Sequence, residues 1–331
     1  MAKVGIGDVA KAAGVSEATV SRVINNRGVV APETRRVVED AMRAVGYSRV
    51  SLGNLVLLLT PGLEDPFFAK LADRMSAALG LQGYRAVIAS APVGGTQELD
   101  YVSAMADAGV LATVFISASN TLADVDPAAY RLLAQRRIPF ICIDGPVAGT
   151  NAPTLSTNDL LAAELAVDHL WNLGHRRLGL IAGPIGNRPS DLRVQGFLAT
   201  VEARGGSRDD AVVIRHEYSI EGGTSATGKL LEAGVTGIVA ASDEMALGAI
   251  RAVRRAGLEV PRDVSVVGYD DAFPLEFLDP PLTTVRQPME RLAQAVVPVL
   301  TRLVQGRPVD TSELLFDPEL IVRGSTAPPP P

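Results

Sequence analysis

The sequence has almost no cysteine and no apolar run of membrane-spanning length. Cys142 is the only cysteine among 331 residues, so the chain cannot form an internal disulfide. It lies in the apolar run IPFICID, where no neighbour supplies the base of a catalytic thiol, and a buried structural thiol is the favoured interpretation. No apolar run reaches the ~18–20 residues of a membrane helix, and the first residues, MAKVGIGDVAKAAG, lack the apolar segment of a secretory signal. We expect a cytoplasmic protein without a membrane partner.

Several signatures of catalysis are missing as well. The sequence contains no Ser/His/Asp set, no metal-ligand spacing and no phosphate-binding GxxxxGK[ST] loop. His175, in LGHRR, is interpreted as a structural turn residue. The first apolar strand is followed by TPGLEDPFF rather than GxGxxG, which argues against an NAD-dependent oxidoreductase. We expect a protein that is not an enzyme and that has neither a metal nor a cofactor.

The composition is that of an ordinary globular protein, with 47% hydrophobic and 21% charged residues. A chain of this length holds two or three compact units. The net charge of −6 is unevenly distributed, because residues 1–50 carry +3 and the remainder carries −9. A basic N-terminal segment on an acidic body fits a phosphate-binding module, although three charges alone would not establish DNA binding.

Residues 8–25, DVAKAAGVSEATVSRVIN, have the pattern of two short helices joined by a tight turn. Gly14 can end the first helix with a positive φ, and Ser16 stands at the N-cap of the second. Apolar side chains recur at helical spacing in both halves: Val9, Ala10, Ala13, Val20, Val23 and Ile24. This pattern predicts a helix-turn-helix, and a helical hairpin with no DNA role is the alternative. A third helix is predicted from Pro32–Glu33 to Gly46.

The second of these helices offers side chains suited to reading DNA. Arg22 can form a bidentate pair with guanine, Glu17 can accept from cytosine, and Ala18 can contact a thymine methyl. Short polar side chains on the same segment suit phosphate contacts: Ser16, Thr19, Ser21 and Asn25. A solvated arginine on the helix surface is the alternative for Arg22.

From Leu55 onward, apolar runs alternate with helical stretches, and the pattern restarts after Pro153. Continuous apolar strands such as LVLLLT and VSVVGY, separated by helices, predict parallel sheets covered on both faces. The fold class is therefore α/β, with two doubly wound parallel sheets and a cleft between them, preceded by the small all-α headpiece.

The sequence resembles the LacI/GalR family of bacterial transcription regulators over nearly its whole length. The matching segments in the headpiece are Asp8–Ala10, Ala13–Ser16, Thr19–Asn25, Pro32–Arg35 and Gly46–Tyr47. Those in the body include Gly174–Arg177, Ser242–Gly248, Gly268–Asp271 and Pro280–Val285. The resemblance implies a body like the type I periplasmic binding proteins. It also implies a homodimeric regulator, a repressor, which binds double-stranded operator DNA under the control of a small-molecule effector, a sugar.

The resemblance also sets the expected domain boundaries. It implies a headpiece at 1–47, a linker at 48–54 and an effector-binding and dimerisation domain at 55–323. The N-subdomain comprises about 55–154 plus 286–314, the C-subdomain comprises about 155–285 plus 315–323, and the tail 324–331 is expected to be disordered. The seven-residue linker SRVSLGN is shorter than the family pattern, since a hinge helix of two turns would take about seven residues by itself. The alternative function is therefore a cytosolic small-molecule sensor with weakened DNA binding.

Polar residues at strand ends are the candidates for effector binding. Ligands of open α/β sheets bind beyond the carboxyl ends of the strands, and Asp144, Asp243 and Asp270 follow three predicted strands. The resemblance implies that Arg193, Asp243 and Asp270 contact the effector and that Phe67 or Phe68 lines the other lobe. The alternative for each acid is a helix N-cap or a loop residue.

Overall fold

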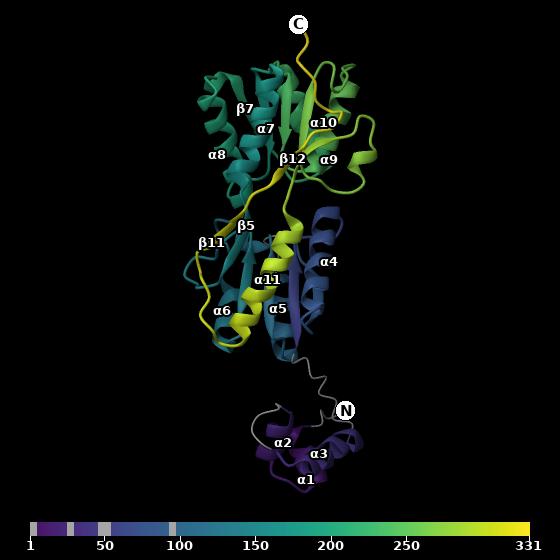
Figure 1. Ribbon diagram of the computed structural model, residues 1–331, viewed down its shortest axis with the longest axis vertical. Coiled ribbons are helices and arrows are strands. Elements are labelled where there is room, and N and C mark those ends of the chain that lie inside the picture. Colours follow the sequence, from purple (N-terminus) through teal and green to yellow (C-terminus); the bar gives the residue numbers. More distant parts are fainter. Residues whose placement is uncertain (1–4, 25–29, 46–53, 93–96) are drawn as a thin grey trace. The chain divides into compact units, whose positions relative to one another are not determined.

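The computed structural model describes residues 5–24, 30–45, 54–92 and 97–331 (Figure 1). The chain divides into two compact units, Met1–Asn54 and Leu55–Pro331. Residues 48–53 of the expected linker, where a hinge helix would lie, are outside the described residues. No helix of the described ranges is long and apolar enough to cross a bilayer.

The N-terminal unit contains the predicted three helices, α1 (Ile6–Ala13), α2 (Glu17–Ile24) and α3 (Pro32–Ala44). Gly14 ends α1 with a φ of 64°, and the Ser16 Oγ accepts a hydrogen bond from the Thr19 backbone N at 3.2 Å. The three helices share one small core: Val9, Ala10, Val20, Val23, Val38 and Ala41. The helix-turn-helix geometry follows from this core, because the apolar stripe of each helix must face the other two.

The second unit begins with a six-stranded parallel sheet in the order β11-β5-β4-β3-β1-β2, which we call the first lobe with its helices. The strands are β1 (Leu55–Thr60), β2 (Arg85–Ser90), β3 (Ala112–Ile116), β4 (Phe140–Ile143), β5 (Thr154–Thr157) and β11 (Glu313–Phe316). Helices α4 (Pro66–Gly80) and α11 (Met289–Val304) cover one face, and α5 (Gln97–Ala108) and α6 (Ala128–Arg136) cover the other. Since β1 and β3 are buried on both faces, their sequences are apolar throughout.

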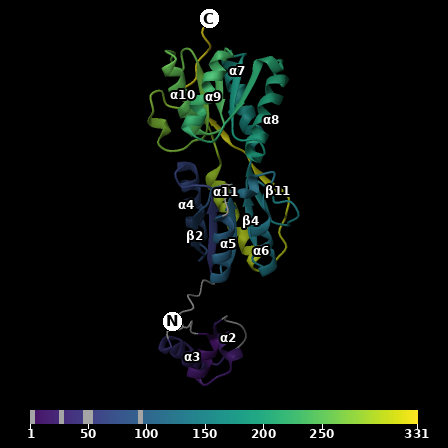
Figure 2. The ribbon, with the colours of Figure 1, turned by 180° about the vertical axis from the view of Figure 1, so that it is seen from behind.

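The second lobe repeats the arrangement in the order β12-β10-β9-β8-β6-β7 (Figure 2). Its strands are β6 (Leu178–Ala182), β7 (Ala211–Arg215), β8 (Gly237–Ala240), β9 (Ser265–Asp270), β10 (Thr283–Arg286) and β12 (Glu319–Ile321). Helices α7 (Asp159–Leu173) and α8 (Arg188–Ala203) cover one face, and α9 (Ile220–Glu232) and α10 (Asp243–Arg255) cover the other. Only the short edge strand β12 runs antiparallel among the strand pairs of the described residues. The two-sheet prediction is confirmed.

The chain crosses between the lobes three times, and two crossings lie slightly later than the sequence suggested. Strand β5 continues to Thr157 and pairs with β4 and β11, so the first crossing follows Thr157 rather than residue 154. Strand β11 continues to Phe316, so the last crossing falls between Phe316 and Glu319 rather than at 314. The yellow segment in Figure 1 follows this last passage from one sheet to the other.

The expectation of a disordered tail from residue 324 is wrong for its first residues. Ser325 is fully buried, and its backbone oxygen accepts a hydrogen bond from the Val266 N at 2.9 Å. The Ser325 Oγ donates to the Val266 O at 2.6 Å, and the Ala327 N donates to the Ser265 Oγ at 3.0 Å. Strand β10 pairs with β9 only from Val267 onward, so the tail satisfies backbone groups of β9 that would otherwise be buried without partners.

Candidate functional site

The surface of α2 presents the side chains that the sequence assigned to base reading. Glu17, Ala18 and Arg22 are exposed, whereas Val20 and Val23 are buried in the core of the unit. Ser16 is exposed, and Thr19 and Ser21 are half-buried beside them. The Ser16 and Thr19 hydroxyls lie 2.9 Å apart, so Ser16 also serves as the cap of the helix. Asn25 lies outside the described residues.

A cavity of about 620 Å³ lies between the two lobes of the second unit, and we call it the cleft. The first lobe contributes the start of α4 and the ends of β3 and β4 to its wall, and the second lobe contributes α8 and the end of β9. Five of the six predicted effector residues line it: Phe67, Phe68, Asp144, Arg193 and Asp270. The volume lies within the range of small-molecule sites in proteins.

Arg193 is the only cationic side chain among the described residues that line the cleft, and the protein itself binds it closely. Its guanidinium donates to the backbone oxygens of Pro189 and Ala241 at 3.3 and 3.0 Å, and to the Tyr218 hydroxyl at 3.2 Å. The guanidinium carbon lies 4.0 Å from the centre of the Tyr269 ring, within the range of a cation–π interaction. The group is therefore fixed in position before any ligand arrives.

Asp159 is the counter-ion of Arg193. Its Oδ1 lies 3.5 Å from the Arg193 Nε and accepts a hydrogen bond from the Tyr269 hydroxyl at 2.8 Å. Burial raises the pKa of Asp159 to about 6, although the Arg193 charge opposes the shift. Asp159 was not among the predicted effector residues. The preceding residue, Asn158, caps α7, because its Oδ1 accepts from the Leu161 N at 3.3 Å.

Two further predicted acids stand at strand ends with unusual backbone angles. Asp144 and Asp270 have φ values of 66° and 117°, which are rare for residues other than glycine and occur most often at functional sites. The Asp144 Oδ2 accepts from the Ser117 Oγ at 2.5 Å, and the Asp270 Oδ1 accepts from the Gln287 Nε2 at 2.7 Å. Burial raises the pKa of both carboxyls. The surrounding lobes therefore hold both groups in defined positions on the cleft wall.

The prediction that Asp243 contacts an effector is wrong. Asp243 is buried and does not line the cleft. Its Oδ2 accepts from the Ala272 N at 2.8 Å, and its Oδ1 accepts from the Thr284 hydroxyl at 2.7 Å. The N-cap of α10 is the preceding residue, Ser242, which does line the cleft. Asp243 therefore holds the loop after β9 and the strand β10 together.

The residue that sequence reasoning missed most clearly is Asp65. It lines the cleft and caps α4, since its Oδ1 accepts from the Phe67 N at 2.9 Å. The sequence indicates the cap, because an acid directly before Pro66 is typical of a helix start. It does not indicate that Asp65 lines the cleft. Tyr218 and Gln287 also line the cleft, and no motif marked them in the sequence. Tyr269 lines it as well and lies in the matching segment Gly268–Asp271, but it was not predicted as a site residue. The aromatic wall is completed by Phe67 and Phe68, whose ring centres lie 5.2 Å apart.

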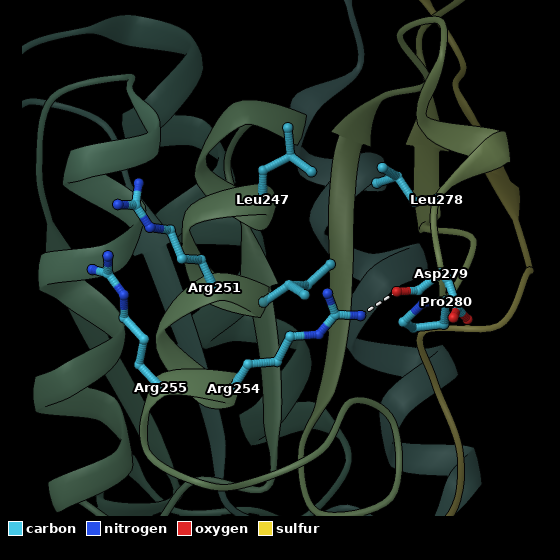
Figure 3. Close-up of a pocket in the computed structure, with 8 residues that line it drawn as sticks. Leu247, Arg251, Arg254, Arg255, Leu278, Asp279 and Pro280 are labelled. Atoms are coloured by element: carbon cyan, nitrogen blue, oxygen red, sulfur yellow. Dashed lines mark hydrogen bonds between the residues drawn. The ribbon is translucent and has the colours of Figure 1, made fainter.

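A second hollow, of about 390 Å³, lies on the second lobe between α10 and the segment before β10 (Figure 3). Leu247 and Leu278 contribute apolar surface, and Arg254 donates to the Asp279 backbone oxygen. In Figure 3, Arg251 and Arg255 extend away from Asp279. The same segment exposes Phe273 by 63% and Phe277 by 73%, with ring centres 5.8 Å apart. We call this region the aromatic face.

Comparison with known proteins finds a matching family for each of the two units. Residues 5–49 match the family described as bacterial regulatory proteins, lacI family, and residues 167–326 match the periplasmic binding protein-like domain. The transcriptional regulator MalR of Streptomyces coelicolor is 43% identical, over 98% of this chain and 97% of its own. The CelR–cellobiose complex superposes with a TM-score of 0.75 at 29% identity, over 97% of this chain and 99% of that one.

The lac repressor dimer bound to operator and an anti-inducer superposes with a TM-score of 0.72 at 27% identity, over 98% of this chain and 100% of that one. Matches of this length cover the helix-turn-helix and both lobes together. The chain belongs to the lacI family of bacterial regulatory proteins, and it is a DNA-binding transcriptional regulator.

Proposed function

We propose that the chain is a repressor whose affinity for operator DNA is controlled by a sugar bound in the cleft. The observation that carries the proposal is the presence, in one chain, of an exposed recognition surface on α2 and a polar, aromatic-walled cavity between two lobes. Sugar-bound and operator-bound relatives support it. Because its target is the chromosome, the protein acts in the cytoplasm.

The proposed reading of DNA follows from the exposed side chains of α2. Arg22 donates two hydrogen bonds to a guanine edge, Glu17 accepts from cytosine, and Ala18 contacts a thymine methyl. Ser16, Thr19, Ser21 and Asn25 bind phosphates and set the register of the helix. One small headpiece makes few contacts, so two copies on a palindromic site are required for specific affinity.

The proposed control works through closure of the lobes. Ligand contacts from both lobes favour a closed arrangement, and the ligand shifts the population of arrangements by its difference in affinity between them. The N-terminal unit is followed directly by β1 of the first lobe. Lobe closure in a dimer would therefore alter how the two headpieces meet the operator. The coupling between ligand and operator is then reciprocal.

The proposed base contacts of α2 are tested by binding of the full-length chain to a palindromic site from its own promoter, measured beside a nonspecific duplex. Arg22→Ala is expected to weaken specific binding by about 1–3 kcal/mol and to leave nonspecific binding nearly unchanged. Arg22→Lys is the matched control, because it keeps the charge but loses the planar fork of donors, so nonspecific binding stays and specificity falls. Equal losses on both duplexes would contradict the assignment of Arg22 to a base contact.

If the parent protein prefers no palindromic site over nonspecific DNA at any salt concentration, the repressor proposal fails. The chain would then be the cytosolic sensor, with a linker too short for both headpieces to bind.

A further inference from the structure

The loop between β6 and α8 of the second lobe bonds directly to the first lobe. The Gly186 backbone oxygen accepts a hydrogen bond from the Ala123 N at 2.8 Å. The Asn187 Nδ2 donates to the Thr121 Oγ1 at 3.2 Å, and Asn187 also forms an isolated antiparallel β-bridge with Leu122. These residues lie outside the segments at which the chain crosses between the lobes, so they join the lobes at a second place.

The next residue along the chain makes a third connection. The Arg188 Nη2 lies 2.6 Å from the Glu313 Oε2, and Glu313 belongs to β11 of the first lobe. The other carboxylate oxygen of Glu313 accepts from the Ser156 hydroxyl at 2.7 Å, which fixes the acid on its own sheet. Neither Arg188 nor Glu313 is among the described residues that line the cleft, so this ion pair acts between the lobes and not on a ligand.

The second lobe holds its side of the contact in shape. Arg215 of β7 donates through Nη1 to the backbone oxygens of Gly183 and Pro184 at 3.1 and 3.2 Å. Its Nη2 donates to the Asp191 Oδ1 at 2.6 Å, and the Asp191 Oδ2 accepts from the Gly186 N at 3.1 Å. The loop therefore has a defined conformation that its own lobe supplies.

The first lobe holds its side in the same way, through the short 3₁₀ helix η1 (Ser119–Thr121). The buried Glu98 of α5 accepts from the Ser119 N and from the Ser119 hydroxyl, at 3.1 and 2.5 Å. The Asn120 Nδ2 donates to the Ile143 backbone oxygen at 2.8 Å. Since both sides are fixed before they meet, little conformational entropy is lost when the contact forms.

The hydrogen bonds of this contact join protein groups alone. The Thr121 hydroxyl donates to the Ala118 backbone oxygen at 2.9 Å, which leaves its oxygen to accept from Asn187. The Asn187 Oδ1 accepts from the Ser190 N at 3.2 Å, so the amide nitrogen is left to donate. Thr121 and Asn187 also line the cleft, so a ligand held by both lobes favours the same arrangement of the lobes as this contact does.

We propose that these three connections form a latch, which holds part of the ligand-free population in the arrangement of the lobes that an effector favours. The latch consists of Gly186, Asn187 and Arg188 on the second lobe and Thr121, Ala123 and Glu313 on the first. The inference rests on the proposed function of the chain as an effector-controlled regulator. Because apparent affinity scales with the fraction of protein in the competent arrangement, the strength of the latch sets both the effector affinity and the operator affinity of the ligand-free protein.

The first test measures the separation of the lobes without sugar or DNA. Spin labels are placed by Asp73→Cys on α4 and Lys229→Cys on α9, at two exposed positions of the full-length chain. Cys142 is buried and takes no label. The labelled protein is diluted with excess unlabelled protein, so that pulsed electron paramagnetic resonance gives distances within one chain.

Two variants are compared with the parent in this labelled background. Asn187→Ser with Glu313→Gln breaks the latch but keeps an N-cap on α8. Glu290→Gln is the matched control, since its ion pair with Arg74 at 3.1 Å lies within the first lobe. We expect the latch-breaking protein to shift the equilibrium about fivefold toward longer distances, and the control to match the parent. Identical distance distributions in all three proteins would overturn the latch.

The second test locks the latch with a disulfide. A Cβ on Gly186 would lie 3.6 Å from the Ala123 Cβ, within the Cβ spacing of disulfides. Ala123→Cys with Gly186→Cys is compared oxidised and reduced, so any strain from a side chain at the Gly186 φ of 81° is present in both forms. We expect the operator affinities of the oxidised protein and the latch-breaking protein to differ about fivefold or more. Equal affinities would contradict the proposed effect of the latch on DNA binding.

The response to sugars separates this inference from the proposed function. Ribose, maltose and cellobiose are the probes, and calorimetry selects the one that binds tightest. At saturation it should move the latch-breaking protein toward the operator affinity of the oxidised protein and leave the oxidised protein unchanged. An equal response in the oxidised, parent and latch-breaking proteins would overturn the latch and leave the regulator proposal standing. If the parent binds no operator specifically, the regulator proposal fails, and the label distances still decide whether the latch exists.

Discussion

The protonation state of Asp159 affects both the electrostatics of the cleft and the stability of the fold. It is 4% exposed and lies between the Arg193 guanidinium and the Tyr269 hydroxyl. Burial raises its pKa to about 6, above the value near 3.8 of an unfolded aspartate. The folded chain therefore binds a proton at this site more tightly than the unfolded chain does, and stability falls as the pH rises from about 4 through 6.

Asp159→Asn removes this titration. We expect the variant to gain stability relative to the parent as the pH rises from 4.5 to 7.5, by at most about 3 kcal/mol, since each pKa unit corresponds to 1.36 kcal/mol. The measurement is the difference between the two thermal midpoints at each pH. A difference that stays constant over the range would show that Asp159 has an ordinary pKa.

Asp271 is the natural comparison because its pKa shifts in the opposite direction. Burial favours the protonated form, but hydrogen bonds from Arg286 and Arg323, at 2.7 and 2.6 Å, outweigh it and hold the pKa below its usual value. The stability it contributes is complete above its unfolded pKa and is lost only in stronger acid. Asp271→Asn is thus expected to lower the midpoint by the same amount at every pH from 4.5 to 7.5.

Single residues also show where prediction from sequence stops. Asp243 and Asp270 both stand near the end of a buried strand, and no local pattern distinguishes the two residues. Asp270 is the last residue of β9 and adopts a positive φ, whereas Asp243 has already entered α10 and its carboxylate bonds Ala272 and Thr284. The direction of a side chain depends on that backbone geometry, which neighbouring segments impose.

Among the elements, α9 and α10 pack unusually closely because glycines lie at their contact. A Cβ on Gly248 of α10 would lie 2.2 Å from the Ile220 backbone oxygen and 2.7 Å from the Thr224 N. A Cβ on Gly223 of α9 would lie 2.1 Å from the Met245 oxygen. These partners are backbone atoms, so neither clash can be relieved by rotation of a side chain.

Gly248→Ala is therefore expected to destabilise the second lobe by about 3 kcal/mol or more, at the upper end of overpacking costs. Gly228→Ala on α9 is the matched control, since nothing lies within 4 Å of its Cβ position. It is expected to stabilise the protein by about 0.5–1 kcal/mol through helix propensity. Chemical denaturation of both variants tests the pair, and a mild effect of Gly248→Ala would contradict close packing of these helices.

The elements that sequence predicted well are those with strong local patterns. The headpiece helices and the buried strands β1 and β9, which the runs LVLLLT and VSVVGY mark, were predicted at or within a few residues of their observed bounds. Strands β11 and β12 are short and largely exposed, and the tail at Ser325 pairs with β9. These segments are held by strands that lie far away in the sequence, so local sequence patterns do not predict their pairing.

On the scale of the whole molecule, the aromatic face is the surface we propose for pairing two copies. Phe273 and Phe277 are large, exposed and adjacent to the hollow lined by Leu247 and Leu278. A symmetric operator requires a two-fold dimer, and an exposed apolar patch of this kind is typical of an interface.

Phe277→Asp is accordingly expected to shift the protein from dimer to monomer in light scattering, because a desolvated charge is unfavourable in an apolar interface. Sugar binding should persist, since the cleft lies elsewhere in the chain's second unit. Leu160→Asp is the control: this exposed residue lies in the first turn of α7, where an acid is well tolerated. A dimeric Phe277→Asp protein would place the interface elsewhere.

The central claim is that occupancy of the cleft controls operator affinity. The most direct measurement is the dissociation constant of the full-length protein for its palindromic operator, with and without a saturating neutral sugar whose binding calorimetry has established. We expect a change of about tenfold or more, within the usual range of allosteric coupling. An operator affinity that is identical with the cleft empty and filled would contradict the account.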